Sequence, residues 1–179
     1  MMINTENSCA FAGHRPDHFQ FGYDENHPDC IALKQVLRKA VLSLIGKGIT
    51  TYYSGMALGV DTWSAELILE LKVQYPELRL IAVLPCETQA NKWTAEQRER
   101  YFDLLPKCDE VIYTGKRYTK TCIFECNRYM VDHAKYLLAV YNGQERGGTA
   151  YTVRYAKKKS RKVLIIYPGT EPIMCREKP

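Results

Sequence analysis

Apolar residues recur along the chain with two periods, and together these predict an alternation of strands and helices. Short and almost continuous apolar runs, typical of strands covered on both faces, occur at 8–12, 51–54, 78–84, 109–113, 136–141 and 163–167. Between these runs, apolar residues spaced three and four apart predict helices at 33–45, 61–74, 94–105, 123–134 and 150–159. The tail, 168–179, carries no strong pattern.

Strands that alternate with helices predict an α/β fold. Its default form is a right-handed, doubly wound, mainly parallel sheet, here of about six strands, with helices on both faces. A chain of 179 residues fits one domain, so we expect a single domain spanning 1–179 with a core at 8–167. Ligands of such sheets bind beyond the carboxyl ends of the strands. A site is therefore expected in the loops that follow the strands.

The stretch 51–61 takes the chain from a strand through a glycine-bearing turn into a helix. Such a turn leaves backbone N–H groups unpaired at the positive end of the helix dipole, which suits a phosphate. Gly55 and Gly59 allow close approach of a ligand or a positive φ. The spacing matches neither the dinucleotide fingerprint nor the P-loop. The alternative is an ordinary tight turn in which Asp61 starts the helix.

Two further loops carry residues suited to phosphate. Gly13-His14-Arg15-Pro16 follows the first strand, and Arg15 can hold a phosphate by two parallel hydrogen bonds. His14 is either a structural hydrogen-bonder or a titrating group. Gly147-Gly148-Thr149 precedes a helix and can present backbone N–H groups and a hydroxyl. The predicted ligand-binding set is Gly13, His14, Arg15, Ser54, Gly55, Met56, Ala57, Gly59, Asp61, Arg128, Gly147, Gly148 and Thr149.

Composition narrows the classes of protein. The chain is 46% hydrophobic and 25% charged, which is ordinary for a soluble globular protein. Apolar runs are too short for a membrane span and no signal segment is recognisable, so we expect a cytoplasmic protein with no membrane partner. The seven cysteines form no C-x-x-C pair, which argues against a disulfide framework and a metal site. A net charge of +5, densest at 157–162, suits anionic ligands or nucleic acid, or marks a solvated helix end.

Four ordered motifs resemble the YpsA-like family of the SLOG superfamily: the loops 13–16 and 147–149, the stretch 54–63 and the stretch 127–132. The resemblance extends over about Cys9 to Tyr167. It implies a Rossmann-like fold and a nucleotide or nucleotide-derived ligand, for which ADP-ribose and an NAD derivative are the usual proposals. The superfamily also includes the SMF/DprA DNA-processing proteins and the LOG phosphoribohydrolases, and it implies a homo-oligomer as a further partner. Membership of the YpsA-like branch does not by itself establish a reaction.

The chain departs from the LOG enzymes at their P-G-G-x-G-T-x-x-E motif. Here the sequence from Arg146 to Val153 is RGGTAYTV, which lacks the first Pro-Gly and the glutamate that acts on the ribosyl bond. The phosphate-binding part is kept, but that hydrolase mechanism loses its acid. Candidate catalytic residues are then other acids and one histidine: Asp61, Glu66, Glu87, Glu125 and His14. The acids have structural alternatives as a helix cap, a surface residue or members of solvated ion pairs.

Three functions remain open from the sequence. The first is a nucleotide-binding sensor, favoured by several glycine-bearing loops without an evident set of nucleophile, base and orienting group. The second is a hydrolase that cleaves an N-glycosidic or phosphate bond of a nucleotide, with a carboxyl group in a dry cleft. The third is single-stranded DNA binding of the DprA type, which would need aromatic side chains interleaved with basic ones.

Overall fold

The computed structural model describes residues 5–178 and contains one seven-stranded sheet of order β4-β3-β2-β1-β5-β6-β7. The first six strands are parallel, and β7 pairs antiparallel with β6. The predicted α/β, mainly parallel and doubly wound fold is therefore confirmed. The strands are β1 (Ser8–Gly13), β2 (Thr51–Ser54), β3 (Arg79–Leu84), β4 (Glu110–Tyr113), β5 (Tyr136–Val140), β6 (Lys162–Tyr167) and β7 (Met174–Lys178).

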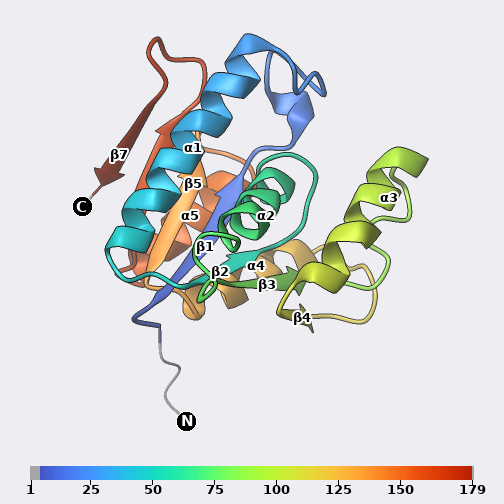
Figure 1. The fold of residues 1–179 in the computed structure, drawn as a ribbon. Coiled ribbons are helices and arrows are strands. Elements are labelled where there is room, and N and C mark those ends of the chain that lie inside the picture. The colour runs from blue at the N-terminus through green and yellow to red at the C-terminus, as the bar shows by residue number, and fades with distance from the viewer. Residues whose placement is uncertain (1–4, 179) are drawn as a thin grey trace.

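Helices cover both faces of the sheet (Figure 1). One face carries α1 (Pro28–Gly46), α2 (Val60–Leu71) and α3 (Ala95–Leu104), and the other carries α4 (Cys122–Asp132) and α5 (Gly148–Lys158). Two short 3-10 turns, η1 (Pro16–His18) and η2 (Leu105–Lys107), complete the elements. Within the described residues, no helix is long and apolar enough to cross a membrane.

The central strand β1 shows why the apolar runs of the sequence are continuous. Cys9 and Phe11 pack into the core beneath α1 and α2, whereas Ala10 and Ala12 pack into the core beneath α4 and α5. Successive side chains of a strand point to opposite faces, so a strand covered on both sides needs apolar residues at every position. The small side chains face the α4 and α5 layer and the larger Phe11 faces the other.

Two glycines bring α2 against β1 and its exit loop. A Cβ added to Gly13 would lie 2.5 Å from the Cβ of Val60, so any larger residue would push α2 away. Gly59, the N-cap of α2, has a φ of 88°, and a Cβ there would lie 2.8 Å from the carbonyl oxygen of His14. A positive φ is strained for other residues. Both glycines therefore fix the start of α2 beside the end of β1.

The seventh strand was not predicted, because its sequence MCREK lacks the apolar pattern of the others. It pairs with β6 from Tyr167↔Met174 to Val163↔Lys178, at one edge of the sheet (Figure 1). Among the described residues after β6, Ile173 and Cys175 pack against the core beneath α1. An edge strand can be mostly polar because one of its sides faces water.

Candidate functional site

A cavity of about 420 Å³ lies beyond the carboxyl ends of β1 and β2. Its walls come from the loops after β1, β2 and β3, from the approach to α4 and its first turns, and from the loop between β5 and α5. The position agrees with the rule for doubly wound sheets, because β2 and β5 flank β1 on opposite sides. The volume falls in the usual range of small-molecule sites, roughly 300–1,000 Å³. All three loops singled out in the sequence contribute to it.

The N-terminus of α5 opens into this cavity without a cap. Gly147 is the N-cap residue, with a φ of 107°, and no side chain caps the helix. Among the described residues, the backbone N–H groups of Gly148, Thr149 and Ala150 have no hydrogen-bond acceptor. The side chain of Thr149 also has none, although the residue is 8% exposed and lines the cavity. This end of α5 is thus a set of hydrogen-bond donors without protein partners.

Positive charge predominates among the lining residues. Arg15, Lys120 and Arg146 are exposed cations that line the cavity, and within residues 5–178 none of the three has an ion-pair partner. His14 also lines it and stacks on His18, with ring centroids 5.3 Å apart. Burial lowers the pKa of His14, so its ring is neutral at pH 7. The lasting positive charge of the site therefore comes from the lysine and the two arginines.

Asp61, in the first turn of α2, is the one carboxyl group among the described lining residues. Burial raises the pKa of Asp61 to about 7, although the Ala57 N–H and the charge of Arg15 favour the ionised form. The Ala57 nitrogen lies 3.4 Å from Oδ2 of Asp61. A Cβ on Gly55 would lie 2.9 Å from the same oxygen, so Gly55 leaves room for the carboxyl group. The group can exchange a proton near neutral pH.

Three N–H groups of the turn between β2 and α2 donate to acceptors within the protein. The Met56 N–H donates to Ser54 Oγ at 3.1 Å, and the Ala57 N–H donates to Asp61. The Val60 N–H reaches the His14 carbonyl at 3.5 Å. Ser54 and Met56 are fully buried behind the cavity wall, and Gly59 packs on the loop after β1. Besides backbone groups, this turn offers the cavity the carboxyl group of Asp61.

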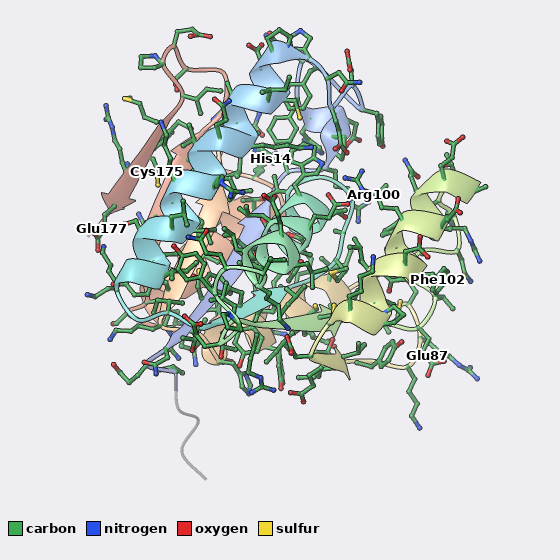
Figure 2. The ribbon with its side chains drawn as sticks, in the orientation of Figure 1. His14, Glu87, Arg100, Phe102, Cys175 and Glu177 are labelled. Atoms are coloured by element: carbon green, nitrogen blue, oxygen red, sulfur yellow. The ribbon has the colours of Figure 1, made fainter. Side chains whose placement is uncertain are left out.

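The remaining predicted residues lie outside the lining of the cavity. Arg128 is exposed on α4, and Glu125 accepts a hydrogen bond from the Thr121 hydroxyl at 2.8 Å. Glu87 is exposed after β3, well away from His14 (Figure 2). Glu66 is bound by Arg100 in an ion pair of 2.6 Å. A binding role for Arg128 and catalytic roles for these glutamates stay predictions.

The predicted set lacked several polar residues of the wall, among them Lys120, Arg146, Gln89 and Asn127. Gln89 donates its side-chain N–H to the carbonyl of Gly55 at 3.0 Å, and Asn127 lines the cavity from α4. Asn127 stands in the apolar stripe of its helix, so a polar residue at that position was the available signal. The buried Oε1 of Gln89 and Nε2 of His14 have no hydrogen-bond partner among the described residues. Buried polar atoms without a hydrogen-bond partner are uncommon, and here they indicate groups that a ligand can bind.

The side chains offer no metal centre within residues 5–178, where no group of three or more His, Cys, Asp or Glu side chains could hold an ion. The cysteines are free thiols. Cys126 lines the cavity and donates to the Val83 carbonyl at 3.1 Å, and burial raises the pKa of its thiol above the usual range. A thiol in that state is a weak nucleophile. The chemistry of the site thus rests on backbone N–H groups, three cations and Asp61.

Proteins of similar sequence occur in bacteria of the genus Bacillus. A UPF0398 protein of Bacillus cereus (strain B4264) is 32% identical over 153 residues, which cover 84% of this chain and 82% of that protein. A UPF0398 protein of Bacillus thuringiensis (strain Al Hakam) matches with the same identity and coverage.

Solved structures of DNA processing protein A (DprA) share the fold. The protein from Streptococcus pneumoniae has a TM-score of 0.60 and 17% identity, and the match covers 94% of this chain and 52% of that chain. The protein from Helicobacter pylori, which binds single-stranded DNA, has a TM-score of 0.60 and 18% identity, with 92% and 66% covered. The chain thus spans about half of the pneumococcal DprA and two thirds of the other.

The YpsA family model, described as the YspA SLOG family, matches residues 9–167. These residues run from β1 to the end of β6 and include every loop that lines the cavity. The match agrees with the resemblance seen in the four motifs. The chain therefore belongs to the YspA SLOG family.

Proposed function

We propose that the cavity binds a nucleotide or a nucleotide-derived molecule, such as AMP, ADP-ribose or an NAD derivative, and that the protein acts as a sensor of it. The observation that carries the proposal is the uncapped N-terminus of α5 with the buried, unpartnered Thr149 side chain. A helix N-terminus with free N–H groups favours an anion, and a threonine hydroxyl can donate to a phosphate oxygen.

The other lining residues have matching roles in this proposal. Arg15 and Arg146 neutralise the phosphate, and their guanidinium groups can each form two parallel hydrogen bonds with it. Asp61 lies across the cavity on α2 and, when ionised, accepts hydrogen bonds from ribose hydroxyls. Gly147, Gly148 and Thr149 of the predicted set hold the phosphate in this proposal, and a phosphate role for the turn 54–61 stays a prediction.

Hydrolysis of such a ligand is the second candidate, and the pKa of Asp61 favours it. A carboxyl group with a pKa of about 7 can donate or accept a proton at neutral pH. Glu87 and Glu125 do not line the cavity, so the enzyme hypothesis depends on Asp61, with His14 as a weaker alternative. A sensor remains the first choice because no nucleophile with an orienting base stands among the described lining residues.

Single-stranded DNA binding, as in the Helicobacter pylori DprA, ranks third. The basic run of this chain, 157–162, lies at the C-terminal end of α5. The cavity lies at the N-terminal end of the same helix. Eleven residues of helix separate the two by about 15 Å. The basic run therefore does not belong to the cavity.

The test is isothermal titration calorimetry of AMP, ADP-ribose and NAD with the Gly148→Asp variant. We expect at least a tenfold loss of affinity, because a carboxylate would stand where the phosphate is held. The fold should be kept: a Cβ on Gly148 meets no heavy atom within 4 Å, and an acidic residue in the first turn suits the helix dipole. Gly148→Asn, of the same size without the charge, is the matched control. Equal affinity of the Asp variant and the wild type would refute the assignment.

A further inference from the structure

The outer wall of the cavity is apolar and aromatic, unlike its floor. It is formed by Tyr118, Ile123 and Phe124, which we call the aromatic wall. These side chains are 69%, 36% and 36% exposed, although all three are large and apolar. Tyr118 belongs to the loop before α4, and the other two to the first turn of α4. The wall thus presents open ring surface beside the polar seat on α5.

Phe124 is held in place by a row of aromatic rings along α5. Its ring meets the ring of Tyr151 edge-on, with centroids 4.7 Å apart and an interplanar angle of 70°. Tyr151 stacks with Tyr155, and the Tyr155 hydroxyl donates to Asp132 at 3.0 Å. Tyr151 supports Phe124 and leaves part of the ring open to solvent. A fixed, partly open ring binds a flat partner at little entropic cost.

Charge around the aromatic wall agrees with an anionic ligand. Lys120 lies two residues after Tyr118, and Arg146 lies just before the free N-terminus of α5. Both are exposed and line the same cavity. A ligand with a flat aromatic group and a phosphate would contact both parts of the site. A phosphorylated sugar alone would leave the rings in water.

We propose that the aromatic wall is the seat of a nucleobase, which stacks on Phe124 while its phosphate lies at α5. This assignment rests on the proposed function, and it narrows the ligand class to nucleotides with an intact base. The largest base stacks over the largest area, so affinity should follow the order AMP, then UMP, then ribose 5-phosphate. Tyr118 covers the base from the loop before α4.

The experiment measures the affinities of AMP, UMP and ribose 5-phosphate by calorimetry for the wild type and for Phe124→Leu. Leucine keeps an apolar side chain but removes the ring. We expect AMP to lose about tenfold in affinity, and ribose 5-phosphate less than twofold. Phe102→Leu is the matched control: Phe102 is 51% exposed on the outer side of α3, away from the cavity (Figure 2). It should change none of the affinities.

Other outcomes separate this inference from the proposed function. If AMP and ribose 5-phosphate bind equally well and both depend on Gly148, the phosphate seat stands and the base seat is refuted. If none of the three binds, and ADP-ribose and NAD do not bind either, both are refuted. If hexathymidylate binds tighter than AMP and loses affinity in Phe124→Leu, the wall serves a polynucleotide, and the assignment to a single nucleotide is wrong.

Discussion

Asp61 is a carboxyl group inside a site that otherwise carries positive charge. Burial raises its pKa to about 7, from a usual value of 3.8. A group whose pKa is raised on folding stabilises the protein below its unfolded pKa, and that contribution is lost as the pH rises through the folded pKa. Between pH 4 and 7, Asp61 is ionised in the unfolded chain but still protonated in the folded one, so the free energy of unfolding falls as the pH rises.

We expect Asp61→Asn to be more stable than the wild type at pH 8, by roughly 1–3 kcal/mol, because asparagine is buried without a charge. The difference should shrink as the pH falls from 8 to 5. Urea unfolding of both proteins at pH 5, 6, 7 and 8 measures it. Curves that stay parallel over this range would show that Asp61 ionises freely in the folded protein.

At the level of residues, the sequence showed which residue types belong to the site, but not which residues they contact. Gly13, Gly55 and Gly59 stand out in the sequence as glycines near a ligand, but their added Cβ atoms would collide with the protein itself, at Val60, Asp61 and the loop after β1. The contacts that explain Gly13 and Gly59 link segments that are far apart in the sequence. A local pattern contains no information on such contacts, which is also why Asn127 and Gln89 were missed.

One carboxylate in the loop between β1 and α1 forms hydrogen bonds with three helices. Glu25 accepts hydrogen bonds from Arg100 on α3, from Lys34 on α1 and from Trp63 on α2, the last at 2.9 Å. Arg100 also binds Glu66 and lies on the side of α3 that faces the rest of the molecule (Figure 2). Burial opposes the charge of Glu25, but these bonds outweigh it and lower the pKa to about 2.

We expect Glu25→Gln to lower the free energy of unfolding by roughly 1–2 kcal/mol at pH 7, because several charged hydrogen bonds are lost and the pair is partly exposed. Because the pKa of Glu25 is lowered on folding, its ionised form stabilises the protein above the unfolded pKa of 4.5. This stabilisation is lost as the pH falls toward 2, so the two proteins should differ less in free energy of unfolding at pH 3. Urea unfolding at pH 7 and pH 3 measures it. Glu70→Gln, which breaks an exposed pair with Arg38, is the control and should cost at most about 0.5 kcal/mol.

At the level of elements, periodicity predicted all five helices and the six parallel strands to within a few residues. It works there because those elements bury a continuous apolar face. The strand β7 and the Glu25 network depend instead on partners far away in the sequence. The bonds of Glu25 span 9, 38 and 75 positions, and no local period records them.

For the whole molecule, ligand binding should appear as added thermal stability, because the cavity joins loops from both halves of the sheet. At a hundred times its dissociation constant, a ligand adds about 2.7 kcal/mol, which shifts the midpoint of a domain of this size by roughly 5–10 °C. A thermal-shift panel with AMP, ADP-ribose, NAD and phosphate tests this. Chromatography after long incubation, against a heat-killed control, then separates a sensor from a hydrolase. A flat panel would remove the support for nucleotide binding.

For the sheet, the sequence predicted the fold class but not the order of the strands. Alternating strands and helices predict a doubly wound sheet, and the carboxyl edge as its binding edge. The order of strands, with β5 beside β1, decides which loops meet, and it follows from packing of the whole chain. The fold class thus predicted that the three loops lie at one edge of the sheet, whereas the strand order and the aromatic wall required the structure.

The pairing of β1 with β5 also governs when the site comes into being during protein synthesis. Cys9 is synthesised well before its partner Tyr136 and the donors of α5. A chain still being translated therefore has Arg15 and Asp61 but no seat for the anion. The free N–H groups of α5 therefore join Arg15 and Asp61 only after synthesis has passed residue 150.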